Sequence, residues 1–210
     1  MTNAITAASA RRRRRHRLAG LACAAFVLAC AGGNARPADG PLTLDRLMAE
    51  LAKVGSGTVR FTEVKSSELL KQPIESRGTL TYIAPARLEK HTLTPREERF
   101  VVDRDAVVIE RPARQERIEF GLDQYPAVRA FVESIRGTLA GDLAALRRHY
   151  RVELEGTSAD WRLHLLPSDP QMAELVQKIL IEGAGSQVRR IEILEASGDR
   201  SVMTITKDRA

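Results

Sequence analysis

Histidine and carboxylate side chains are the groups of this 210-residue chain that could bind a metal ion or move a proton. Adjacent Glu97 and Glu98 would point to opposite faces of a strand, so they form no acid/base pair, and Glu116 and Glu119 are the other carboxylates close in sequence. No histidine stands at metal-ligand spacing from another ligand; the four are His16, His91, His149 and His164. The sequence has neither a Gly-x-Ser-x-Gly turn nor a phosphate-binding glycine loop. We therefore expect no catalytic residue, no metal, no cofactor and no enzyme activity.

The N-terminal segment has the organisation of a secretory signal. Residues 11–17 are basic, residues 18–31 are apolar and rich in small side chains, and a small-residue cleavage pattern ends at Ala35. The sequence thus predicts a signal peptide over residues 1–35 and a single exported domain over 36–210, located in the periplasm. An uncleaved anchor is the alternative, although the apolar run is short for a transmembrane helix.

Both cysteines, Cys23 and Cys30, lie in this segment, so cleavage after Ala35 would leave a mature chain without cysteine. The residues Val27-Leu28-Ala29-Cys30 also match in part the lipobox that precedes a lipidated cysteine. Acylation at Cys30 would tether the protein to the inner or outer membrane, because two acyl chains give stable anchoring.

The formal charge of +6 and the isoelectric point near 9.7 would fit a nucleic-acid-binding protein. Six arginines of the first 35 residues account for that excess, and residues 36–210 contain equal numbers of basic and acidic side chains. The exported domain therefore lacks the basic footprint of such a protein, and we expect no nucleic-acid partner.

Hydrophobic periodicity predicts three helical segments and a long series of strands. The helical segments are 43–54, capped by Thr43, 126–147, with a break near Asp142, and a turn at Asp169-Pro170. The predicted strands are 58–66, 75–83, 87–93, 97–103, 106–110, 114–120, 150–155, 160–166, 177–183, 188–196 and 200–207. The spacing of Met172, Leu175, Val176 and Ile179 would also allow a longer helix before the strand at 177.

Short strands at close spacing indicate an antiparallel meander, since parallel strands need crossover connections. The predicted fold is α+β: one strongly curved antiparallel sheet, an unclosed β-barrel, with amphipathic helices across its open face. The space between sheet and helices is either an apolar hollow for an acyl chain or a packed core, and periodicity alone does not separate the two.

Two stretches resemble the outer-membrane lipoprotein carriers of the LolA type. They are Arg60-Phe61-Thr62-Glu63 and the segment from Arg77 to Leu88, which holds a Gly-x-Leu-x-Tyr strand and a proline-containing turn. The order of the elements is also similar over residues 43–207. The resemblance implies a periplasmic chaperone whose unclosed barrel and helical lid carry the acyl chains of a lipoprotein, or of another lipid, towards the outer membrane.

The chain departs from the family pattern at three positions. Glu63 stands where the family has Gln, Ala84 where it has an Arg that helps to hold the lid, and Lys90 where it has Trp. These departures favour a divergent branch of the family, with another acylated or polyene-type lipid of a dedicated export or biosynthetic pathway as cargo.

The resemblance implies as partners an acylated lipoprotein or lipid cargo, an inner-membrane donor and an outer-membrane acceptor, and we expect a monomer. A tethered acceptor similar to LolB is the alternative if Cys30 is lipidated, and a periplasmic hydrolase or transferase is a third hypothesis. We expect Phe131 and Ile135 to belong to the lid. The expected lipid-binding residues are apolar strand positions: Phe61, Leu80, Tyr82, Leu88, Phe100, Trp161, Leu163, Ile191, Ile193, Met203 and Ile205.

Overall fold

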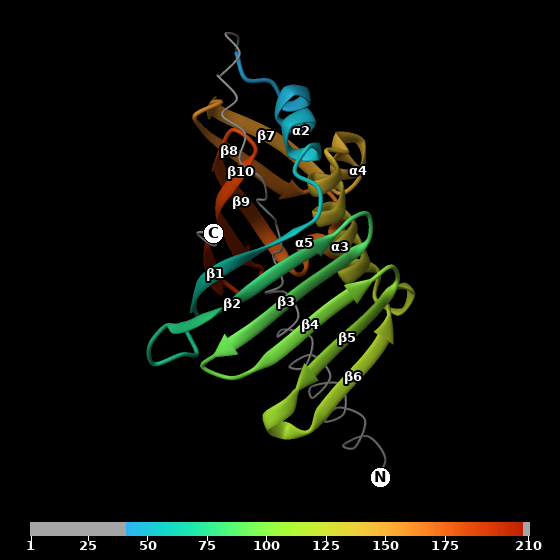
Figure 1. Ribbon diagram of the computed structural model, residues 1–210, viewed down its shortest axis with the longest axis vertical. Coiled ribbons are helices and arrows are strands. Elements are labelled where there is room, and N and C mark those ends of the chain that lie inside the picture. The colour runs from blue at the N-terminus through green and yellow to red at the C-terminus, as the bar shows by residue number, and fades with distance from the viewer. Residues whose placement is uncertain (1–40, 208–210) are drawn as a thin grey trace, which may run out of the picture.

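The computed structural model describes residues 41–207, apart from the side chains of residues 126, 127, 130, 131 and 134 (Figure 1). Eleven strands form one sheet in which all neighbours are antiparallel, in the order β6-β5-β4-β3-β2-β1-β11-β10-β9-β8-β7. The sheet is not closed, because β6 and β7 are its edges and do not pair with each other. The predicted α+β fold with an open antiparallel sheet is confirmed.

The strands follow the predicted series closely. They are β1 (Gly57–Ser66), β2 (Ile74–Ile83), β3 (Arg87–Thr94), β4 (Glu98–Asp103), β5 (Ala106–Arg111), β6 (Glu116–Gly121), β7 (Tyr150–Thr157), β8 (Asp160–Pro167), β9 (Val176–Ala184), β10 (Gln187–Glu195) and β11 (Arg200–Thr206). Buried and more exposed side chains alternate in β1, β8, β9 and β11, among others, which gives the sheet one face packed against the core.

The helices are α2 (Leu44–Ala52), α3 (Pro126–Ala140), α4 (Leu143–Arg147) and α5 (Pro170–Ala173). Side-chain oxygens cap three of them, because Thr43, Asp142 and Asp169 accept bonds from backbone N–H groups of the first turn. Gly141 separates α3 from α4 with a φ of 69°, a conformation that suits glycine. Within residues 41–207 no helix has the length and apolarity needed to cross a bilayer.

The predicted strand boundaries all lie within two residues of the observed ones. The last strand before the helical segment starts at Glu116 rather than 114, because Pro112–Arg114 forms a 3-10 turn that ends at Gln115 in the left-handed region. The helix at Pro170 stops at Ala173, and β9 then pairs with both β8 and β10. Strand pairing, which is a tertiary interaction, thus decides against the longer helix that the spacing would allow.

Candidate functional site on the inner face of the sheet

We define the inner face as the face of the sheet that packs against the helices. Its buried apolar side chains form one cluster with residues of α2, α3, α4 and α5. Ten of the eleven strand residues predicted to bind lipid are buried members of this cluster, and Phe100 is partly buried against it. The same placement suits a lipid-binding surface and a packed core, so a contact with lipid stays a prediction for these residues.

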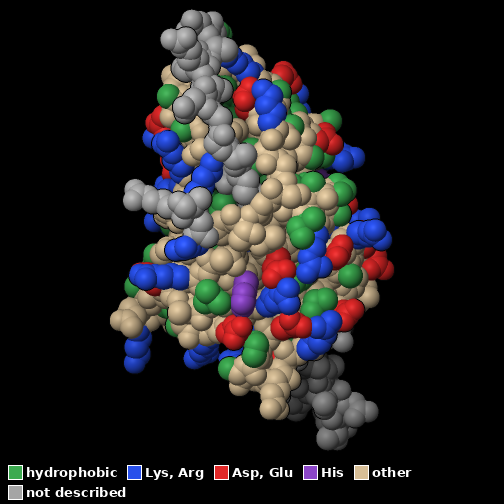
Figure 2. Space-filling model, in the orientation of Figure 1, with side chains coloured by type: hydrophobic (Ala, Val, Ile, Leu, Met, Phe, Trp, Pro, Cys, Tyr) green, Lys and Arg blue, Asp and Glu red, His purple; other side chains and the backbone are tan. Residues whose placement is uncertain are grey.

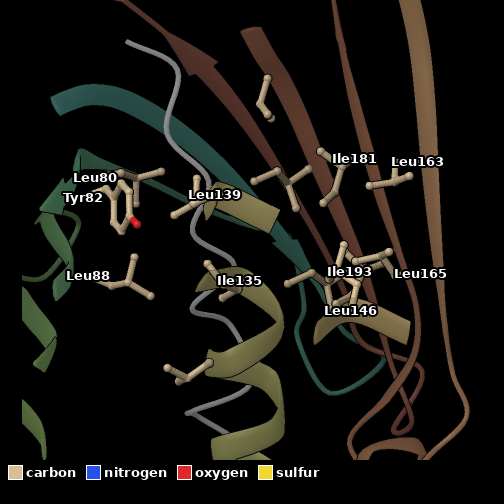
Figure 3. Packing of buried hydrophobic residues seen from close by; sticks show 14 of the residues in the cluster. Leu80, Tyr82, Leu88, Ile135, Leu139, Leu146, Leu163, Leu165, Ile181 and Ile193 are labelled. Carbon is tan, nitrogen blue, oxygen red and sulfur yellow. The ribbon is translucent and has the colours of Figure 1, made fainter. Parts of the chain in front are cut away.

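Helix α3 lies between the two halves of the sheet. Ile135 and Leu139 stand between the strands that carry Leu80 and Tyr82 and those that carry Ile181, among others (Figure 3). The helix also contacts α2, α4 and α5. Ile135 is therefore buried between the two halves of the sheet, and its role in a lid stays a prediction. The side chain of Phe131, the other predicted lid residue, lies outside the described part.

The inner face of β1–β6 is apolar at one end of the strands and polar at the other. The apolar end holds a complete cross-strand row of Tyr82, Leu88, Val102, Val107 and Phe120. The opposite end of the same face holds Glu63, Lys65, Ser76, Thr92, Glu98 and Arg111. A border between apolar and polar surface therefore crosses the inner face.

A buried ion pair marks this border. The Lys90 ammonium donates to Glu63 Oε2 at 2.5 Å, and the Ser201 hydroxyl donates to Glu63 Oε1 at 2.6 Å. All three residues are less than 10% exposed. The Lys90 Nζ also lies 5.1 Å from the centroid of the Phe61 ring, within cation–π range. The inner face thus contains ionised groups held by specific partners on three strands.

The sheet register explains how Lys90 on β3 reaches Glu63 on β1 across β2. Phe61 stands opposite Gly78, and Gly78 stands opposite Thr92, so β2 presents no side chain at this point of the inner face. Gly78 also allows β3 to approach closely, because an added Cβ would lie 1.9 Å from the carbonyl oxygen of His91. Two departures from the family pattern, Glu63 and Lys90, are therefore partners in one ion pair, which the sequence analysis did not foresee.

Two further ion-pair clusters continue the polar end of the inner face. Lys65 Nζ lies 3.1 Å from Glu195 Oε1 and 3.9 Å from Asp199 Oδ2. The second cluster joins Arg111 to Glu98 at 2.6 Å and to Glu116 at 3.1 Å. Each of these clusters joins one cation to two carboxylates.

Arg136 attaches α3 to the turns beside the apolar end of the face. Its guanidinium donates to the carbonyl oxygen of Ala86 at 2.6 Å and to that of Arg104, which belong to the β2–β3 and β4–β5 turns. Burial lowers the pKa of Arg136, and burial raises the pKa of the nearby Tyr82 phenol despite the opposing effect of the Arg136 charge. The sequence analysis missed Arg136, because nothing in the pattern of one helix shows which carbonyl groups will face it.

No group of three or more potential metal ligands occurs among the described side chains. His91 contacts Glu97 at 3.0 Å, His164 lies 3.5 Å from Glu155, and His149 lies between two carboxylates of other elements. Glu97 pairs with His91 and Glu98 pairs with Arg111, so the two adjacent carboxylates do not act as one pair. Cys30 and the predicted signal peptide lie outside the described residues.

The outer face of the sheet carries interleaved acidic and basic side chains, visible over β3–β6 in Figure 2. Hydrogen bonds from arginines on neighbouring strands lower the pKa of three glutamates, Glu89, Glu182 and Glu192. The main donors to these carboxylates are, in that order, Arg99, Arg190 and Arg200. The charges on this face are largely matched in cross-strand pairs.

The fold and the inner face together define an α+β protein in which one open sheet wraps its apolar side around amphipathic helices. The family model described as "outer membrane lipoprotein carrier protein LolA-like" matches residues 35–207. The chain therefore belongs to the LolA-like family, as the resemblance predicted, and is a divergent member of it. No curated protein matches the sequence significantly.

Solved structures of low sequence identity match the chain with TM-scores below 0.5. A LolA superfamily protein from Nitrosomonas europaea has a TM-score of 0.42 and 14% identity, over 80% of this chain and 94% of that one. LprF from Mycobacterium bovis has a TM-score of 0.34 and 10% identity, over 81% of this chain and 97% of the other. The family assignment rests on the match to the family model.

Proposed function

We propose that the protein binds the acyl chains of a lipoprotein or another lipid against its inner face and carries them through the periplasm towards the outer membrane. The observation that carries this proposal is the continuous apolar surface of an unclosed sheet, with α3 lying across it. Members of the LolA-like family are binding proteins of the cell envelope rather than enzymes, which supports a carrier without catalytic residues.

The physical need for such a carrier is large. Exposing an acyl chain to water costs about 0.8 kcal/mol per CH₂ group, so an aqueous crossing requires a protein surface that replaces the membrane. Release requires that the cover over this surface can move. Helix α3 suits the role of this cover, because side-chain hydrogen bonds of Arg136 hold it to the β2–β3 and β4–β5 turns and such bonds can break when the lipid is released.

Native mass spectrometry of the exported protein, purified from the periplasm without detergent, tests the proposal. A bound lipid or acylated peptide on a mature chain beginning near Arg36 is the expected result, and the mass of the ligand would identify the cargo class. A well-folded protein that never carries or accepts lipid would show that the inner face is a filled core.

The same spectra test the second candidate, a membrane-tethered acceptor similar to LolB. The lipobox-like residues before Cys30 favour it. A mature chain that begins with a diacylglyceryl Cys30 would replace the soluble carrier by this acceptor, whereas cleavage after Ala35 would remove the only site of lipidation that we propose.

A further inference from the structure

We infer that the Glu63–Lys90 pair binds the ester linkage at the polar end of a bound acyl chain, and that it thereby fixes the direction of the chain on the inner face. This inference rests on the proposed function and adds the chemical group that the protein recognises. It starts from the position of the pair at the border between the apolar and polar ends of the inner face.

The direction of the chain follows from the two ends of this face. The row that contains Tyr82, Leu88 and Val102 is apolar apart from the Tyr82 hydroxyl, and these three residues are less than 4% exposed because they pack in one cluster with the helices. An acyl chain that takes the place of the helical cover gains from burial against this row, whereas the same chain placed on the ion-pair clusters would cut charged groups off from water. The chain therefore extends from the border towards the β2–β3 and β4–β5 turns.

The chemistry of the polar end selects the linkage. A carbonyl oxygen at the border accepts a charge-assisted hydrogen bond from the Lys90 ammonium, which Glu63 and the Phe61 ring hold in place. The Glu63–Lys90 pair has no net charge, and the clusters around Lys65 and Arg111 each join one cation to two carboxylates. These charges favour a neutral acyl ester over the carboxylate of a free fatty acid or an anionic headgroup.

Two ligands that differ only at the ester linkage test the proposed contact with the ester carbonyl, and they need no variant of the protein. 1-Palmitoylglycerol has the ester carbonyl, and 1-hexadecylglycerol, an ether, replaces it by a methylene group. We expect the lipid-free full-length exported protein to bind the ester about tenfold more tightly, measured by displacement of a fluorescent acyl probe, because a hydrogen bond to a charged group has about that effect. Equal affinity for the two ligands would overturn the inference and leave the proposed function intact, whereas binding of neither would overturn both.

The double variant Lys90→Met/Glu63→Gln assigns the preference to this pair. Replacing both partners leaves no unpaired buried charge, and the amide oxygen introduced by Glu63→Gln can still accept from Ser201. We expect the ester-to-ether preference to fall from about tenfold to nearly one, with ether binding retained. The matched control is Arg162→Met/Glu182→Gln on the outer face, where the two side chains lie 3.1 Å apart, and its preference should stay unchanged. An unchanged preference in the Lys90/Glu63 variant would exclude Lys90 from the contact.

Two sources could supply the ester, a lipoprotein or a phospholipid. The competitors are a diacylglyceryl-cysteine peptide and phosphatidylglycerol with the same acyl chains, each added against bound 1-palmitoylglycerol. The two carboxylates per cation in the clusters around Lys65 and Arg111 predict that the peptide displaces the ligand at lower concentration. Stronger displacement by phosphatidylglycerol would keep the ester site and make a phospholipid its source, and displacement by neither would overturn the inference.

Discussion

Lys90 and Glu63 lie in surroundings where an ionised group is stable only with its partner. Lys90→Met would leave the Glu63 carboxylate buried with one partner fewer, so we expect the free energy of unfolding to fall by about 3–5 kcal/mol. Urea denaturation at neutral pH, followed by the fluorescence of Trp161, the single tryptophan of the chain, measures this change.

Two further variants show whether the loss of stability in Lys90→Met comes from the unpaired charge or from lost packing. Lys90→Met/Glu63→Gln should lose less than about 2 kcal/mol, because neither charge remains without its partner. Arg162→Met, on the exposed outer face, should change stability by less than about 1 kcal/mol. A loss in the double variant as large as in Lys90→Met would mean that packing of the lysine stem, rather than charge pairing, dominates.

At the scale of the element, Arg136 is a partly buried side chain through which α3 binds two turns of the sheet. Arg136→Met removes charge-assisted hydrogen bonds to two carbonyl groups, each contributing about 1.5–3 kcal/mol. We expect amide hydrogen exchange to become about tenfold faster or more in α3, with β8–β10 unchanged. Mass-spectrometric hydrogen exchange of peptides covering 126–140 measures this local opening.

Arg129 provides the control on the same helix. Its pairs with Glu133, at 2.9 Å, and with Asp105 of the β4–β5 turn, at 3.7 Å, are solvent-exposed ion pairs, which stabilise a helix only weakly. Arg129→Met should therefore leave exchange in α3 within about threefold of the parent protein. Equal effects of the two substitutions would mean that Arg136 has no special part in holding α3.

The cross-strand pairs of the outer face make stability depend on pH. The pKa values of Glu89, Glu182 and Glu192 are lowered in the folded chain, so the folded state holds these carboxyls ionised where the unfolded chain begins to bind protons. Their contribution is therefore complete above the ordinary pKa of about 4.5 and is lost as the pH falls through the lowered folded values. Replacing the three by glutamine should flatten the decline of thermal stability below about pH 4.5. An equally steep decline in that variant would assign acid sensitivity to other carboxyls.

At the scale of the molecule, the open sheet has two edge strands that could pair with another chain. Charged side chains stand on both, Arg117 and Glu119 on β6, and Arg151 and Glu153 on β7. Charges on an edge strand oppose edge-to-edge pairing, so we expect a monomer in sedimentation velocity experiments.

Neutral substitutions at one edge test this expectation. Arg117→Val/Glu119→Val should cause self-association that grows with protein concentration, because β6 is then an uncharged edge. Arg162→Val on β8, an interior strand, should leave the sedimentation of the protein unchanged. A parent protein that already dimerises at micromolar concentration would contradict the expected monomer.

The sequence by itself determined the elements and the orientation of their apolar faces. Alternation along β1 and β8 and the 3.6-residue spacing in α3 are local properties, so they could be read without any knowledge of the partners. The family could also be predicted, because the segment from Arg77 to Leu88 and the order of the elements are features of the chain itself.

Only the tertiary structure decided which distant residues meet. Glu63 and Lys90 are 27 positions apart, and Ser201 lies 138 positions from Glu63, so their contacts depend on the register of β1 with β2 and β11. The contacts of Arg136 with two turns depend on where α3 packs against the sheet. The border across the inner face depends on the register of β1–β6. Periodicity specifies the face of each side chain, whereas strand register sets its neighbours on that face, and register is fixed only when the whole sheet has formed.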